Sequence, residues 1–392
     1  MKRIYLDHAA TTPTHPEVAQ AMLPYLTPEA FGNPSSAHAF GRAAGQAVEE
    51  AREKIAALIG ATSEEIFFTS GGTEADNWVI RGVAYANRHK GNHIITSAIE
   101  HHAVLNTCKL LEEEFRITYL PVDRYGLVDP DEVRRSITSE TILISVMHAN
   151  NEIGTIEPIP AIGKIARDAG VYFHTDAVQT VGHIPVDVTE LGADLLSVSA
   201  HKLYGPKGIG ALYVRKGTKI SPLIVGGAQE RGARAGTENV PGVVGFGKAA
   251  ELAQKELPET MSRLTQLRDQ LIQGLQERIR GTHLNGHPES RLPQNVNVSF
   301  EGVDGEAIAL ALDQAGISVS TGSACSTGAE EPYHDVIALG VSPELARGAV
   351  RLTLGRDTTR GEIMRVLEIM PPLVERLRTV SGACDASSAG FI

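Results

Sequence analysis

The sequence predicts an α/β fold with a mostly parallel sheet flanked by helices. Apolar segments of strand length alternate with helical segments through the first two thirds of the chain. Several of these strand segments are apolar on both faces, as expected for strands that helices cover on both sides. The gap between Ser199 and Gly210 leaves no room for a helix, so we expect one antiparallel pair there.

We predict the helices and strands of this larger part from the spacing of apolar residues and from the residues that end each element. A helix is predicted over 42–59, because Ala, Val and Ile recur at helical spacing before Gly60. Two further helices are expected at 74–88 and 159–169. The predicted strands are 66–69, 93–97, 117–121, 141–148, 171–175, 195–199 and 210–214.

The pattern changes after about residue 255 and predicts a second, smaller α+β domain. It begins with a long amphipathic helix at 259–280. The remaining elements are strands at 295–300, 317–320 and 349–354 and helices at 305–315 and 358–378. We expect a large domain over 15–254 and a small domain made of 1–14 and 255–392.

Composition excludes several classes of protein. The 392 residues carry a net charge of −11, which argues against a nucleic-acid binder. Three cysteines cannot form a disulfide scaffold and suit a reducing compartment. The start of the chain does not read as a signal peptide, and no apolar run reaches the roughly 18 residues that span a bilayer. We therefore expect a cytoplasmic protein without a membrane segment.

Polar residues gather where predicted strands end, which is where ligands bind in such sheets. The turn at 69–74 contains Gly72 and Thr73 and leads into a helix, so its N–H groups could cradle an anion. Taken alone, this turn is better explained by helix capping than by an anion site. Asp176 and Gln179 follow another strand, where Asp176 could pair with a protonated ring nitrogen or simply cap a helix.

Lys202 directly follows a buried strand that includes Ser199 and continues through His201. A lysine at a dry strand end has a lowered amine pKa and can form a Schiff base. Pyridoxal 5′-phosphate (PLP) chemistry requires this lysine, a carboxylate for the ring nitrogen and a phosphate cradle. The joint presence of all three favours a PLP enzyme over a surface lysine.

Two further segments could serve such a site. His101 follows a strand and could stack on an aromatic cofactor, whereas its neighbour His102 cannot join it on one metal, so no metal centre is expected. Cys325 lies between two glycines in a segment of small residues, which is typical of an accessible loop. Cys108, within a helical run, is expected to be an inert buried thiol, and Arg351 could bind a carboxylate or form a structural ion pair.

With these residues considered together, the chain resembles the NifS/IscS-type cysteine desulfurases, which belong to the class-V aminotransferases and have PLP fold type I. The resemblance runs in order along nearly the whole chain. It rests on the segments 5–13, 31–36, 69–77, 147–154, 195–208, 234–240 and 322–325.

The resemblance implies a role for each matching residue. Lys202 would hold PLP, Asp176 would pair with the ring nitrogen, Gln179 would bond the ring hydroxyl and His101 would stack on the ring. Further roles are implied for the phosphate ligands, the substrate ligands and the nucleophile: Gly72, Thr73, Ser199 and His201, with Thr237 from the other subunit of a homodimer; Asn33, Asn151 and Arg351; and Cys325. Asn151 would also contact the cofactor.

The implied reaction converts L-cysteine and the Cys325 thiol to L-alanine and a persulfide. The implied partner is a sulfur-acceptor protein such as an iron–sulfur scaffold, where Cys325 would transiently share ligation of the cluster. A selenocysteine lyase or a small-amino-acid aminotransferase of the same fold is the nearest alternative. A non-catalytic assembly platform is a more distant alternative, since it would need neither Lys202 nor Asp176.

Overall fold

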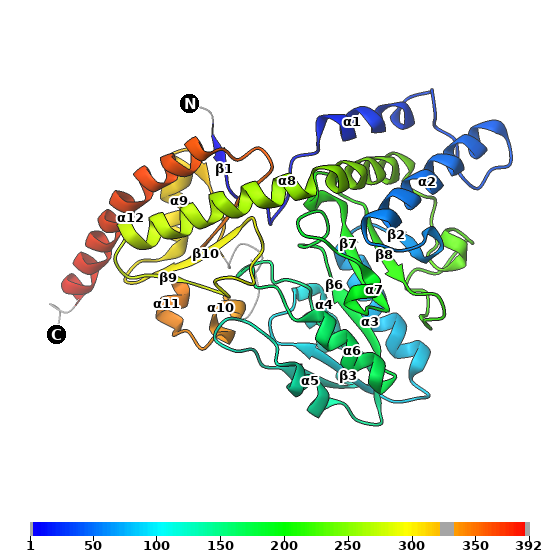
Figure 1. The fold of residues 1–392 in the computed structure, drawn as a ribbon, viewed down its shortest axis with the longest axis horizontal. Helices are drawn as coiled ribbons and strands as arrows, with labels where there is room; N and C mark the ends of the chain where they lie inside the picture. The colour runs from blue at the N-terminus through cyan, green and yellow to red at the C-terminus, as the bar shows by residue number, and fades with distance from the viewer. Residues whose placement is uncertain (1–2, 322–332, 389–392) are drawn as a thin grey trace.

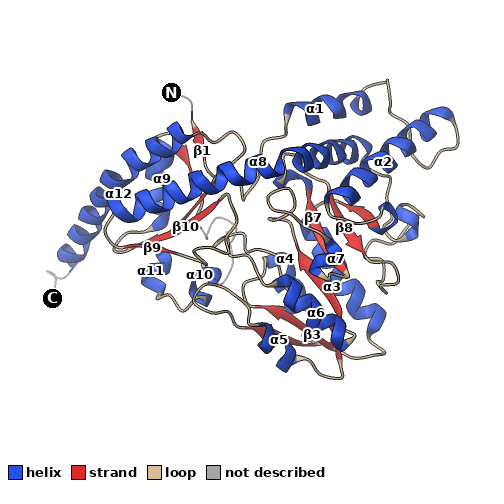
Figure 2. Ribbon diagram, in the orientation of Figure 1, coloured by secondary structure: helices blue, strands red, loops and turns tan. Residues whose placement is uncertain are grey.

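The computed structural model describes residues 3–321 and 333–388, with side chains up to residue 379. Its main sheet has seven strands in the order β2-β8-β7-β6-β5-β3-β4. In chain order these are β2 (Ile66–Thr69), β3 (His93–Ser97), β4 (Arg116–Leu120), β5 (Thr141–Ser145), β6 (Tyr172–Asp176), β7 (Leu195–Ser199) and β8 (Gly210–Val214). Figure 2 shows strands of this sheet, among them β3, β7 and β8, in red among blue helices.

The sheet is parallel except around β8, which runs antiparallel to both of its neighbours, β7 and β2. The antiparallel pair expected after Ser199 is therefore confirmed. Because β2 is antiparallel to β8, it has the same direction as β7. The carboxyl ends of β2, β3, β6 and β7 therefore lie at one edge of the sheet, and they bring their following turns together.

Alternation along the strands explains why helices cover both faces. Neighbouring residues such as Ile94 and Ile95, or Leu195 and Leu196, belong to opposite hydrophobic clusters, because successive side chains in a strand point to opposite faces. One face packs on α3 (Gly72–Asn87) and α4 (His102–Leu111). The other packs on α2 (Ala39–Leu58), α6 (Ile159–Ala169), α7 (Val188–Leu191) and the first part of α8 (Val240–Arg278).

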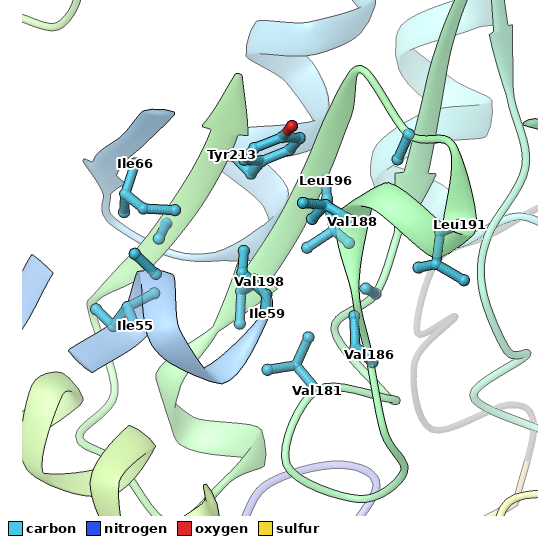
Figure 3. Packing of buried hydrophobic residues seen from close by; sticks show 14 of the residues in the cluster. Ile55, Ile59, Ile66, Val181, Val186, Val188, Leu191, Leu196, Val198 and Tyr213 are labelled. Carbon is cyan, nitrogen blue, oxygen red and sulfur yellow. The ribbon is translucent and has the colours of Figure 1, made fainter. Parts of the chain in front are cut away.

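The second of these clusters is seen from close by in Figure 3. Ile55 of α2 and Ile59, which caps the C-terminus of α2, pack with Val198 of β7, and Val188 of α7 lies near Leu196. Each buried aliphatic side chain of this kind contributes about 1.5–3 kcal/mol of transfer free energy. Packing in this cluster therefore holds the sheet in place, and with it the polar residues at the strand ends.

A separate hydrophobic cluster forms around the second half of α8. It packs Leu271 and Leu275 of α8 against Val296 and Val298, with Leu6 from the start of the chain. The elements here are β1 (Ile4–Tyr5), β9 (Thr282–Leu284), β10 (Asn295–Phe300), α9 (Gly305–Gln314), β11 (Ile317–Ser318), β12 (Ala349–Thr353) and α12 (Arg360–Ser388). Figure 1 shows α8 passing from the main sheet to this group, beside α12.

The helix predicted at 259–280 is in fact part of α8, which begins at Val240 after the cap residue Asn239. The prediction started directly after Pro258, a residue that usually interrupts a helix, but α8 continues through it. The expected domain boundary at 254/255 thus falls inside a helix, and the division into 15–254 and 1–14 with 255–392 stays a prediction.

Short elements complete the chain. They are α1 (Pro16–Met22), α5 (Pro130–Ser136), α10 (His334–Ala338), α11 (Pro343–Arg347) and the 3₁₀ turns η1 (Leu23–Leu26), η2 (Ser63–Glu65), η3 (Ala200–Lys202) and η4 (Glu230–Gly232). Among them, η3 places Lys202 one turn beyond the end of β7.

Candidate active site

A cavity of about 270 Å³ lies at the shared carboxyl edge of the sheet. The predicted site residues that line it come from several strand ends and from β12 and are Gly72, Thr73, His101, Asn151, Asp176, Gln179, Ser199, His201, Lys202 and Arg351. The structure therefore brings these predicted residues to one place, although they span most of the chain.

Lys202 and Asp176 face this cavity from neighbouring parallel strands. The Lys202 amine donates hydrogen bonds to the carbonyl oxygens of Ala9 and Ala10, the latter at 2.8 Å. Burial raises the pKa of Asp176 to about 6, while the Val178 N–H (2.9 Å from Asp176 Oδ1) and the Lys202 charge act in the opposite direction. A buried carboxyl of this kind favours a cationic or N–H partner within the cavity.

The phosphate cradle expected from the sequence sits at the N-terminus of α3. A second hollow of about 310 Å³ opens beside the first and shares Gly72, Thr73, Ser199 and His201 with it. The first N–H groups of α3 have no partners within the helix and point into this region. A Cβ on Gly72 would lie 2.8 Å from a methyl carbon of Val178, so the packing there favours glycine.

Both cavity histidines are neutral at neutral pH. Burial lowers the pKa of His101 to about 4, and the nearby Lys202 charge acts in the same direction. His101 Nδ1 accepts the Ala103 N–H (3.1 Å) and caps α4, so a neutral His101 ring carries its proton on Nε2. Burial likewise lowers the pKa of His201 to about 4, and its Nδ1 lies 3.0 Å from the Thr11 hydroxyl.

Arg351 closes one side of the cavity from β12 and is nearly fully buried. It donates to the Asn151 carbonyl (3.1 Å) and forms ion pairs with Glu152 (2.5 Å) and Asp7 (3.0 Å). The structural ion pair considered from the sequence is therefore present, and Arg351 also lines the cavity, while its binding of a substrate carboxylate stays a prediction.

Two of the predicted site residues that the structure describes, Asn33 and Thr237, are not brought to the cavity lining in this chain. Asn33 is exposed on the loop before α2, where its side chain accepts the Ser35 N–H (2.9 Å). Thr237 is exposed on the loop before α8. Cys325 lies outside the described residues. The roles assigned to these three residues stay predictions.

Other residues of the site were not singled out from the sequence. Asp76, one helical turn after Thr73 on α3, lines the cavity, and burial raises its pKa well above the ordinary value, with the Asp176 charge adding to the shift. The helical spacing from Thr73 is the sequence feature that could have identified Asp76. No local sequence feature indicates that Asp7 and Glu152 contact Arg351, because that contact depends on the tertiary fold.

The residues present fit PLP. The cavity has an acid at Asp176, an amine at Lys202 and an imidazole at His101, and the N-terminus of α3 offers N–H groups that could hold an anion. Among the residues that the structure describes, no group of three or more His, Cys, Asp and Glu could hold a metal ion. The described helices include none that is long and apolar enough to cross a bilayer.

Comparisons with known proteins agree with this geometry. A family model described as aminotransferase class-V matches residues 4–366. The chain is 60% identical to a cysteine desulfurase IscS of Dictyoglomus turgidum over 383 residues, which cover 97% of each protein.

Two solved structures are also similar over most of their length. A NifS-like protein has a TM-score of 0.90 at 40% identity, covering 96% of this chain and 100% of that one. A structure described as SspA in complex with cysteine has a TM-score of 0.81 at 38% identity, covering 91% of this chain and 100% of that one.

Proposed function

Because the chain belongs to the class-V aminotransferase family, with cysteine desulfurases as full-length relatives, we propose that it is a PLP-dependent cysteine desulfurase. It converts L-cysteine to L-alanine and moves the sulfur to Cys325. The observation that carries the proposal is the convergence of Lys202, Asp176 and the α3 N-terminus on one cavity. The C–S bond of L-cysteine breaks, a proton replaces sulfur on the substrate, and Cys325 becomes a persulfide.

Bound PLP would supply an electron sink for the carbon next to the substrate amine. The chain's own residues hold and orient the participants. The N–H groups of Gly72 and Thr73, with Ser199 and His201, would bind the phosphate, and Asp176 would hold a proton on the ring nitrogen. Gln179 would bond the ring hydroxyl, and His101 would stack on the ring.

The remaining groups act on the substrate. Lys202 Nζ would hold the cofactor, and its amine is the group that would move a proton at the substrate Cα. Arg351 binds the substrate carboxylate through its planar fork, with Asn151 and Asn33 as further substrate ligands. Cys325 attacks the substrate sulfur as a thiolate, since the thiol form is a poor nucleophile.

A homodimer completes the site in this proposal, with Thr237 of one subunit reaching the phosphate of the other. The loop that carries Thr237 is anchored by a bidentate pair between Arg234 and Glu74 (2.8 and 3.0 Å), beside the cradle of its own subunit. A second copy would also cover exposed apolar side chains, including Phe31 (64% exposed) and Val225 (86%).

Mixed dimers test the contribution of Thr237. Lys202→Ala and Thr237→Val subunits are each expected to give weakly active homodimers. If Thr237 acts across the interface, mixing the two creates one intact site per heterodimer and restores activity. If Thr237 acts within its own subunit, mixing restores nothing, and the shared site is excluded.

Sulfur then leaves Cys325 for an acceptor protein such as an iron–sulfur scaffold, with which Cys325 would transiently share ligation of the cluster. We place the reaction in the cytoplasm, where thiols stay reduced. The catalytic role is tested by L-alanine production from L-cysteine, with Cys325→Ala against Cys108→Ala as a matched control. Loss only in Cys325→Ala supports a desulfurase, whereas full alanine production by Cys325→Ala would favour an aminotransferase or lyase.

A further inference from the structure

The Arg351 guanidinium has two acidic partners on different segments. Its Nη1 donates to Glu152 Oε1 (2.5 Å), and its Nη2 donates to Asp7 Oδ1 (3.0 Å). Both pairs lie at the wall of the cavity that Arg351 lines. Any substrate carboxylate that reaches Arg351 therefore meets a cation that is already paired.

Glu152 and Asp7 differ in how strongly their surroundings hold them in place. Glu152 is almost fully buried (side chain 5% exposed), and its Oε1 also accepts the Asn151 side-chain N–H (3.1 Å). Its backbone is fixed as well, since its carbonyl accepts N–H bonds from Asn295 and Asn297 (both 3.1 Å). Moving Glu152 would leave buried polar groups without partners, which is costly.

Asp7 is less constrained. Its side chain is 21% exposed, and within the described part of the chain its carboxylate has one hydrogen bond, the one from Arg351. It lies just beyond β1, on a segment that also reaches the cofactor ligands: Ala9 O accepts from Gln179 (3.1 Å), and Ala9 and Ala10 accept from Lys202. The Asp7 carboxylate can turn toward solvent without breaking the bonds of Glu152.

Electrostatic repulsion requires one acidic partner of Arg351 to leave when a substrate carboxylate binds. Three carboxylates around one guanidinium would repel one another strongly in a site shielded from water. We propose that Asp7 is the exchangeable counter-ion of Arg351, which the carboxylate of the amino-acid substrate displaces, while Glu152 keeps the guanidinium in place.

In the absence of substrate, Asp7 compensates a buried charge that would otherwise be costly. When substrate binds, its carboxylate takes the Nη2 side of Arg351, and Asp7 is released to water. Asp7 thereby weakens the binding of every carboxylate ligand and has no effect on amines without one. This inference rests on the proposed role of Arg351 as the substrate-carboxylate ligand.

The test measures ligand binding to the PLP-loaded enzyme by calorimetry and by the cofactor's absorption band. The ligands are L-alanine and ethylamine, which is the same molecule without its carboxylate. Asp7→Asn and Asp7→Ser are each expected to lower the Kd of L-alanine roughly two- to fivefold, a range typical of losing one partly exposed ion pair, and to leave ethylamine unchanged. Asp313→Asn, which removes an exposed partner of Arg3, is the control and should change neither Kd.

Weaker or unchanged L-alanine binding in both Asp7 variants, or an equal change for ethylamine, overturns the inference, because Asp7 would then be an anchor. Failure of both variants to fold or to retain the cofactor overturns it as well. Arg351→Lys separates this outcome from failure of the proposed function. If it leaves L-alanine binding intact, the role of Arg351 is wrong; if it weakens binding while Asp7→Asn does not tighten it, only the exchange fails.

Discussion

Lys202 and Asp176 line one cavity from the ends of adjacent parallel strands, β7 and β6. Neither residue would be informative alone, since lysines are common at surfaces and aspartates are common helix caps. Their convergence brings an amine and an acid to one cavity, where both could serve the same cofactor ring. Two predictions depend directly on this relationship.

Replacing Lys202 by Ala removes the amine that holds the cofactor. We expect loss of the visible band of the PLP-loaded enzyme and a fall in L-alanine production of about 10³-fold or more, because proton transfer is also lost. Absorption spectroscopy and amino-acid analysis measure both effects. Lys164→Ala, at an exposed site on α6, should behave like the parent enzyme. An unchanged spectrum in Lys202→Ala would remove this lysine from the mechanism.

Asp176→Asn keeps the shape of the side chain and removes its charge. The cofactor should still attach through Lys202, but its ring nitrogen would no longer be held in the protonated form. We expect kcat to fall by about 10²–10³-fold while the absorption band persists, an effect comparable to losing one strong electrostatic contact to a transition state. A variant with full activity would show that the acid serves only to hold the turn after β6, where its Oδ1 accepts the Val178 N–H.

A buried ion pair holds the segment that follows β8, the last strand of the main sheet, against α2. Arg52 of α2 binds both carboxylate oxygens of Glu230 (2.7 and 3.0 Å), and Glu230 also accepts the Phe68 N–H (2.8 Å). Arg52→Ala would leave Glu230 buried and unpaired, so we expect unfolding free energy to fall by about 3–5 kcal/mol. Chemical denaturation measures the loss.

Arg134→Ala is the matched comparison, because Arg134 pairs with Asp131 on the exposed surface of α5. Exposed pairs contribute about 0–1 kcal/mol, so this variant should be nearly neutral. Equal, small losses in the Arg52 and Arg134 variants would contradict the structural role assigned to the buried pair.

The raised pKa of the buried Glu100 carboxyl leads us to expect that the free energy of unfolding depends on pH. Burial raises its pKa to about 8, although Ser97 Oγ and the Met147 N–H both donate to it. The unfolded chain releases this proton near the ordinary pKa of about 4.5, so the folded state binds more protons between pH 4.5 and 8. The stabilising contribution is complete below 4.5 and is lost as pH rises to 8.

Glu100→Gln keeps an oxygen for both donors and cannot ionise. We expect it to remove this slope and to be more stable than the parent at pH 8, by a few kcal/mol at most. Denaturation midpoints at several pH values provide the measurement. A parent protein whose stability stays flat over this range would contradict the assigned protonation.

Much of the fold and site was predictable because the signals were local. Strands such as β7 are recognisable as apolar runs, and Lys202 lies one short turn beyond the end of β7, so the strand end located the site. Boundaries failed where context overrode propensity, as at Pro258, which α8 accommodates. Asp7 and Arg351 meet across 344 positions, and no local pattern encodes that contact.

The central claim is that sulfur from L-cysteine is transferred to one thiol, and mass spectrometry of peptides after L-cysteine treatment tests it most directly. We predict one added sulfur atom on Cys325 and none on Cys108, whose thiol has a pKa that burial raises to about 12. Treatment that leaves Cys325 unmodified while L-alanine accumulates would contradict the account.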